Sequence, residues 1–347
     1  MFVLSSYITI GNYSMKGVHQ VVIKKSIHSY VDTAVISLPT SYVLQFAPGQ
    51  LLPNVSLPQL PAAGSTASVF KEGDPITIQL GYDGQLQDEF EGFVKRVNFG
   101  RPCEIECEGF VWLMRNTDFL FTKSWKTTTI LEVLQYITAP WPEIKLSPDI
   151  QNVSFGPFRI TERTGAEVLE DLKKALGFTV YFIGNTIYAG LQYLAQLQSS
   201  VSYRLGWNTI DDGQLKFRTQ DETRVTVSVD YKDKQGKNHH VIYGKKNGSA
   251  KPMQYTIGVV TDENTRRQMA NAFARKYRYA GYEGHVSAFL QPYAQHGWKN
   301  SLFSKPYPQR NGDYILESTE LHFGMQGGRR ILEIGRTITP QEELDEQ

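Results

Sequence analysis

The stretch EGDPITIQLGYDGQ, residues 72–85, decides how the first part of the chain folds. Its apolar residues Ile76, Ile78 and Leu80 alternate with polar ones, which is the period-2 pattern of a strand with one buried face. The stretch ends in GYDG, whose glycines supply the positive φ that a tight turn needs. A second alternating segment, FEGFVKRV at residues 90–97, follows almost at once. We therefore predict a β-hairpin whose alternating apolar side chains face a core.

The composition excludes several classes of protein. A chain of 347 residues is long enough for two or three domains, and 41% hydrophobic with 20% charged residues is ordinary for a globular protein. A net charge of +1 provides no large field for nucleic acid or an anionic membrane. The N-terminal segment lacks the pattern of a signal peptide, and no window approaches the ~18 apolar residues of a membrane-spanning helix. We expect no specific nucleic-acid binding and no membrane insertion.

Residues 1–46 read as strands, and a proline-rich loop then covers residues 47–68. Its core, residues 47–61, is apolar and too rich in proline for a regular central strand. An arm that packs against a neighbouring chain would explain this composition, and so would a loop that lies on its own domain. The candidate contacts with another subunit or partner are Pro48, Leu51, Leu52, Pro53, Leu57, Pro58, Leu60 and Pro61.

The apolar period changes from strand-like to helix-like after residue 110. Ile130, Leu134 and Ile137 recur at helical spacing, and Pro140 ends that helix. A second helix is predicted to begin near Thr164.

That second helix carries its own start signal. Glu167 follows Thr164 at the spacing of a capping box. Gly184-Asn185 then marks the turn of a short hairpin. These signals predict a small α+β unit.

The pattern along the whole chain predicts an α+β protein that is mainly β. We expect a first tube-type β-barrel domain in residues 1–110, an inserted α+β domain in 111–195, and a second β-barrel domain in 196–339. The last domain should contain one helix, residues 263–279, and an acidic tail should follow in residues 340–347. The final hairpin, like the first, begins with Gly-Asp and turns at glycines, which suggests two barrels of related design.

The search for catalytic chemistry yields no constellation. Cys103 and Cys107 share one face of a strand but lie roughly 13 Å apart by strand geometry, too far for a disulfide. His239 and His240 are adjacent, so on a strand they point to opposite faces. No zinc spacing, nucleophile elbow or phosphate loop is present. We expect no catalytic residues, no metal site and no cofactor.

Two groups of acidic residues alternate with apolar ones and are predicted to form solvated strand faces. A pair of carboxylates brought together by the fold could still form a glycosidase site. The groups are Asp88, Glu89 and Glu91, and Glu104, Glu106 and Glu108.

The order of these segments resembles the baseplate hub proteins of contractile phage tails. That family includes late control protein D and the hub part of type VI secretion spike proteins. The resemblance rests on DTAVISLP (32–39), FKEGDPITIQLGYDGQ (70–85), FEGFVKRV (90–97), IECEGFVWLM (105–114), ERTGAEVLEDLKKALGFTVYF (162–182) and PYPQRNGDYILESTELHFGMQGGRRILEIG (306–335).

The resemblance implies a structural protein without catalytic residues. Three subunits, each with two barrels, would form a pseudo-six-fold ring that joins the tail tube to the central spike. The protein would be made in the bacterial cytoplasm and assembled into a virion tail or tail-like particle. We expect the proline-rich arm and the acidic tail to contact other chains. A carbohydrate-binding β-protein and a tail-associated peptidoglycan hydrolase are the alternatives.

Overall fold

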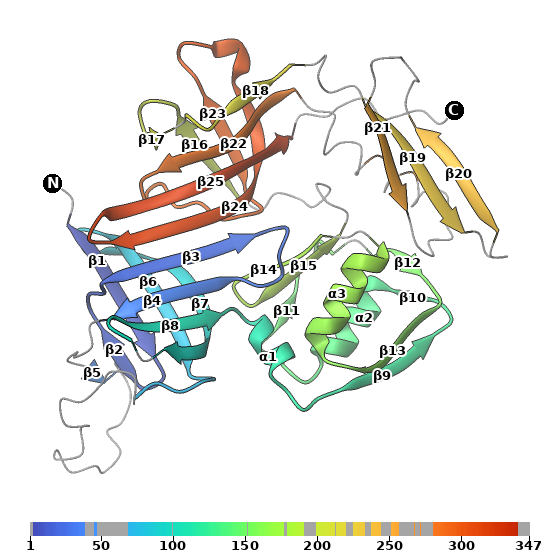
Figure 1. The fold of residues 1–347 in the computed structure, drawn as a ribbon, viewed down its shortest axis with the longest axis horizontal. Helices are drawn as coiled ribbons and strands as arrows, with labels where there is room; N and C mark the ends of the chain where they lie inside the picture. The colour runs from blue at the N-terminus through green and yellow to red at the C-terminus, as the bar shows by residue number, and fades with distance from the viewer. Residues whose placement is uncertain are drawn as a thin grey trace.

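The structure is a computed structural model, and its element order follows the predicted α+β, mainly β class (Figure 1). It describes residues 3–38, 45–46, 69–98, 100–150, 152–176, 179–190, 199–211, 213–219, 225–232, 237–243, 251–256, 267, 271 and 280–338.

The first β region supplies eight strands. They are β1 (Leu4–Ile10), β2 (Tyr13–Met15), β3 (Gln20–Ser26), β4 (Thr33–Leu38), β5 (Gln45–Phe46), β6 (Pro75–Tyr82), β7 (Gln85–Asn98) and β8 (Cys103–Glu108). The predicted hairpin is β6–β7, and Ile76, Ile78 and Leu80 are fully buried as predicted. The turn itself is only Asp83-Gly84, both with positive φ. Gly81 belongs to β6 and pairs with Leu86. A glycine is needed there because a Cβ would lie 1.8 Å from the carbonyl oxygen of Gln85.

The inserted unit (residues 111–190) combines short strands with the helices α1, α2 and α3. Its elements are α1 (Val111–Arg115), β9 (Phe121–Trp125), β10 (Thr128–Thr129), α2 (Ile130–Thr138), β11 (Lys145–Leu146), β12 (Ser154–Phe155), β13 (Phe158–Arg163), α3 (Gly165–Leu176), β14 (Thr179–Ile183) and β15 (Thr186–Gly190). Both predicted helices and the Gly184-Asn185 hairpin are confirmed.

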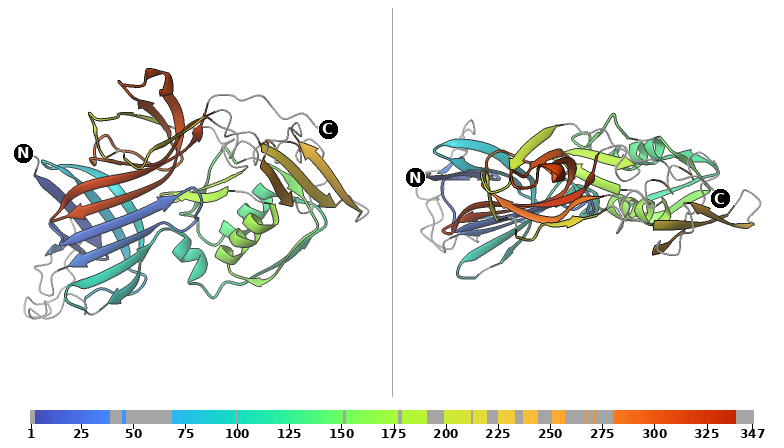
Figure 2. Two further views of the ribbon diagram at one scale, coloured as in Figure 1. Left: turned by 45° about the horizontal axis from the view of Figure 1, so that its top comes forward. Right: turned by 90° about the horizontal axis from the view of Figure 1, so that it is seen from above.

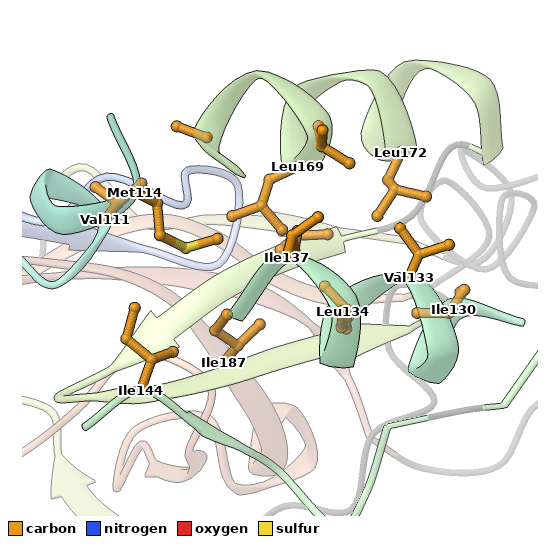
Figure 3. Close-up of a cluster of buried hydrophobic side chains, with 14 of the residues drawn as sticks. Val111, Met114, Ile130, Val133, Leu134, Ile137, Ile144, Leu169, Leu172 and Ile187 are labelled. Atoms are coloured by element: carbon orange, nitrogen blue, oxygen red, sulfur yellow. The ribbon is translucent and has the colours of Figure 1, made fainter. Parts of the chain in front are cut away.

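Helix α3 is capped as predicted. The Thr164 hydroxyl accepts from the Glu167 backbone N–H at 3.3 Å, and the Glu167 carboxylate accepts from the Thr164 backbone N–H at 2.8 Å. Buried residues of the helices face one another and β15, as Figure 3 shows for Leu134, Leu169 and Ile187. The unit therefore has a hydrophobic core of its own.

The second β region comprises β16 (Ser200–Arg204), β17 (Thr209–Asp211), β18 (Lys216–Arg218), β22 (Gly281–Ala288), β23 (Lys299–Phe303), β24 (Gly312–Gly324) and β25 (Gly327–Thr337), with a 3-10 helix η4 (Pro308–Arg310). A separate sheet holds β19 (Val225–Lys232), β20 (Asn238–Tyr243) and β21 (Lys251–Thr256). Within the predicted helix 263–279, Arg267 and Asn271 are helical, and the other positions up to 279 lie outside the described residues. The acidic tail also lies outside them.

The two β regions are parts of one sheet. It contains 15 strands, and its main path runs β17-β22-β25-β24-β3-β4-β8-β7-β6-β1-β2-β5. The described strands do not close this sheet, and the two β regions keep separate hydrophobic cores. The division into two barrel domains stays a prediction. In both views of Figure 2 the β24–β25 hairpin runs beside the strands of the first region.

Candidate functional site

The seam between β3 and β24 joins the two β regions. These strands are antiparallel, and their register runs from Ser26↔Ser318 to Gln20↔Gly324. On the outer face Lys24 Nζ lies 3.0 Å from Glu320 Oε1. The backbone ladder therefore continues from one region to the other without a gap.

A buried ion pair holds the two regions together on the inner side. Arg330 of β25 places Nη2 2.6 Å and Nη1 3.2 Å from the two carboxylate oxygens of Glu89 on β7. Only 2% of the arginine side chain and 3% of the glutamate side chain are exposed. The guanidinium also donates to the carbonyl oxygens of Leu290 and Ala294. Because a buried charge is costly without such partners, the pair favours one arrangement of β7 and β25.

The prediction that Glu89 lies on a solvated face is wrong, and a β-bulge explains why. Strand β6 pairs Ile78 with Phe90 and then Gln79 with Asp88, so Glu89 is the extra residue. A bulge takes one side chain out of the regular alternation, and here the displaced side chain enters the core. Asp88 is exposed as predicted.

Glu108 is a second exception to the predicted solvated faces. Its side chain is 3% exposed and lies 2.6 Å from both Lys95 Nζ and Arg115 Nη1. Glu108 ends β8, and the chain then turns into α1, which carries Arg115. The carboxylate is thus buried where the first β region meets the inserted unit, with two cations to compensate it.

The loop between β22 and β23, residues 289–298, contacts both β regions and the inserted unit, and we call it the bridging loop. Leu290 belongs to the core of the first β region, and Ala294 to that of the second. His296 Nε2 donates to the carbonyl oxygen of Phe182 in the inserted unit at 2.7 Å. One loop therefore ties the three parts of the chain together.

Buried titratable groups surround the bridging loop. Burial raises the pKa of Asp32 to about 7, although Lys25 opposes the shift. The Lys25 ammonium donates to Gln295 Oε1 at 3.4 Å, and burial lowers the pKa of this lysine. His296 is fully buried, and burial together with nearby Lys25 lowers its pKa to about 3. The imidazole is therefore neutral near pH 7.

The residues considered for chemistry are scattered. Cys103 and Cys107 are buried free thiols on β8, and burial raises the pKa of both. His240 Nδ1 lies 2.6 Å from Asp230 Oδ1 across two strands, and both side chains are partly exposed. Within the described ranges, no three His, Cys, Asp or Glu side chains could together hold a metal ion.

The predicted contact residues of the proline-rich arm cannot be placed in this site. Pro48, Leu51, Leu52, Pro53, Leu57, Pro58, Leu60 and Pro61 all lie outside the described residues.

Sequence reasoning missed Glu89 and Arg330, which join the two β regions. The sequence does contain one signal. In a regular strand, residues two apart face the same side, so Asp88 would face the core together with Phe90 and would be buried there without a partner. That conflict indicates an irregularity in β7. Nothing local identifies which carboxylate turns inward, or that its partner lies 241 residues further along.

None of the helices in the described part of the chain is long and apolar enough to cross a membrane. No protein-family model matches the sequence, and no curated protein matches it either.

Solved structures match the fold over nearly the whole chain. The tail protein from Neisseria meningitidis MC58 is similar with a TM-score of 0.64 and 11% identity, covering 96% of both chains. The 43 kDa tail protein of prophage MuSo2 from Shewanella oneidensis has a TM-score of 0.59 and 12% identity, covering 96% of this chain and 98% of that one.

A third similar structure comes from a secretion machine. The E. coli c3393 protein, a component of the type VI secretion system with structural similarity to T4 bacteriophage tail proteins gp27 and gp5, has a TM-score of 0.50 and 7% identity. The match covers 95% of this chain and 74% of that one. At the level of the fold, the resemblance seen in the sequence is confirmed: this chain has the architecture of phage tail proteins and of a type VI secretion component.

Proposed function

We propose that the chain is a structural baseplate hub protein of a contractile phage tail or a related injection machine. Three copies form a ring that joins the tail tube above to the central spike below. The protein is made in the bacterial cytoplasm and is then assembled into the tail or tail-like particle. Its role is to hold other proteins in place, and it performs no catalysis.

One observation carries this proposal: a single chain supplies two adjoining wall segments. The β3–β24 seam makes the two β regions one sheet, and the buried pair of Glu89 and Arg330 fixes them to each other. Each region contributes a long hairpin, β6–β7 or β24–β25. Three such chains would offer six similar segments, which suits a joint between a six-fold tube and a three-fold spike.

The similar structures support the same role. Two of them are tail proteins, and the third is a secretion-system component similar to T4 tail proteins. Within the proposed ring, residues 47–61 and the acidic residues 340–347 make contacts with neighbouring chains.

The mass of the purified protein in solution tests the proposal. Light scattering over a range of concentrations should give three times the 39.4 kDa of one chain, with ring-shaped particles in electron micrographs. A monomer at every concentration, including in the presence of the spike protein, would contradict the ring. A zymogram on bacterial cell walls tests the alternative of a peptidoglycan hydrolase, because a hub protein leaves the wall intact. A glycan-binding assay tests the carbohydrate-binding alternative, because a hub protein should show no glycan binding.

A further inference from the structure

The chain leaves its last strand beside the beginning of β24. Thr337, the last residue of β25, lies near Tyr314 as its pairing partner. The Ile338 N–H then donates to the carbonyl oxygen of Asp313 at 2.8 Å. Residue 338 is the last that the structure describes. The acidic tail, residues 340–347, therefore continues from a fixed point on the second β region.

An arginine lies close to that point. Arg310 is three residues before Asp313, so their backbones are at most about 11 Å apart. The Arg310 guanidinium lies 4.3 Å from the centre of the Tyr307 ring and 4.8 Å from that of the Phe217 ring. Its carbonyl oxygen accepts from the Tyr314 hydroxyl at 3.4 Å, which ties the arginine to β24.

A second cation, Lys305, is exposed in the same loop between β23 and β24. We call the surface formed by Phe217, Lys305, Tyr307 and Arg310 the cationic surface. Tyr307 is 48% exposed, so the ring that Arg310 covers on one side is open to a ligand on the other. Cations held on aromatic rings favour a ligand that carries carboxylates.

The carboxylates of the neighbouring strands are paired with other cations. Glu283 lies 3.2 Å from Arg218, and Asp313 lies 3.1 Å from Lys299. Within the described ranges, no carboxylate lies within ion-pair distance of the two cations of the cationic surface. These two charges are therefore available to carboxylates from elsewhere.

The acidic tail has complementary charge and sufficient length. Its four carboxylates are those of Glu342, Glu343, Asp345 and Glu346. Fully extended, the residues after Ile338 span roughly 30 Å, which is nearly three times the longest possible distance between the backbones of Asp313 and Arg310. A short tether gives an effective concentration in the millimolar range, so even weak surface ion pairs are formed for much of the time.

We propose that the acidic tail docks on the cationic surface of its own chain, with its carboxylates beside Lys305 and Arg310. The inference goes beyond the proposed ring, because it concerns a contact within one chain. A tail held there covers the two cations and the exposed Tyr307 ring, so the surface does not attract acidic segments of unrelated proteins. The outer side of the docked tail stays free for the contacts with neighbouring chains that we propose in the ring.

Cross-linking of the full-length chain with a carbodiimide tests the proposal, because this reagent joins an amine only to a carboxylate in contact with it. Mass spectrometry should recover Lys305 joined to the acidic tail from the 39.4 kDa band of a denaturing gel. Arg310→Glu keeps every reacting group and should lower the yield about tenfold, since it repels the tail. Salt at about 1 M should also lower the yield in the wild-type chain, because it screens the ion pairs.

Lys123→Glu is the matched control. The Lys123 ammonium also lies over two rings, 4.8 Å from that of Trp125 and 4.6 Å from that of Tyr136, but in the inserted unit. This variant should give the wild-type yield, and circular dichroism checks the fold of both variants. A wild-type chain without the cross-link from Lys305, or with a yield that salt does not lower, would overturn the proposal. A cross-link found only in the band of twice the mass would also overturn it, because the tail would then lie on another copy, as the proposed ring allows.

Discussion

At the scale of single residues, Glu89 depends on an arginine that lies 241 residues further along the chain. Arg330→Leu would leave that carboxylate buried without its partner, so we expect the free energy of unfolding to fall by about 3–5 kcal/mol. The double variant Glu89→Leu/Arg330→Leu should recover most of this loss, because it removes both charges from the core. The free energies of unfolding of both variants are measured by urea denaturation, monitored through tryptophan fluorescence. An Arg330→Leu protein within about 1 kcal/mol of the wild type would show that water reaches the carboxylate.

Two other buried residues give opposite pH dependences. The folded chain raises the pKa of Asp32 from 3.8 to about 7, so the stability that Asp32 contributes falls as pH rises through that range. It lowers the pKa of His296 from 6.5 to about 3, so the contribution of His296 is lost as pH falls through that range. Between pH 4.5 and 6.5 the two effects should nearly cancel in the wild type.

Single variants should uncover each effect. In Asp32→Asn only the effect of His296 remains. The free energy of unfolding should therefore rise by about 2 kcal/mol between pH 4.5 and 6.5, since one pKa unit corresponds to about 1.4 kcal/mol. In His296→Gln only the effect of Asp32 remains, and the free energy of unfolding should fall by a similar amount over the same rise in pH. Urea titrations at the two pH values provide the measurement. Parallel pH profiles for both variants would contradict the opposing shifts.

A structural feature could be predicted from the sequence when the residues that cause it are close together in the chain. The inner face of β6 follows from alternation within the five residues 76–80, and the α3 cap follows from two side chains three residues apart. The bulge at Glu89 is a property of two paired strands, and the Arg330 contact exists only once the sheet has formed. Sequence reasoning therefore found the elements and missed the contacts that join them.

At the scale of elements, the proline-rich arm is the segment whose role most needs a test. Replacing residues 47–61 with a Gly-Ser linker should prevent or weaken ring formation while each subunit still folds, if the arm packs on a neighbouring chain. Light scattering measures the assembly, and circular dichroism the fold. The matched control replaces residues 233–236, which connect β19 to β20, with the same kind of linker and should leave the mass unchanged. A normal ring after loss of the arm would favour a loop that lies on its own domain.

At the scale of the whole molecule, the first β region borrows part of its core from the second. Leu290, Leu321 and Phe323 pack with the buried residues of β1–β8, and Arg330 neutralises Glu89 there. We therefore expect a fragment of residues 1–110 to be poorly folded, with weak amide protection from hydrogen exchange in β3 and β7. The full-length chain, in which the missing strands are present, is the control. A fragment with the protection of the full chain would mean that the first region folds independently.

The β3–β24 seam also sets an order of events during synthesis of the chain. Until β24 has been made, β3 is the edge of a partial sheet, and open edges are prone to pair with the wrong strand. The ribosome adds the missing strand roughly 300 residues later, which takes about 15–60 s at typical elongation rates. Lys24 lies in the second half of β3, and a lysine on a strand edge disfavours pairing with other chains. After β24 has paired with β3, the Glu320 carboxylate neutralises Lys24. The lysine that disfavours wrong pairing during synthesis therefore becomes part of an ion pair across the β3–β24 seam.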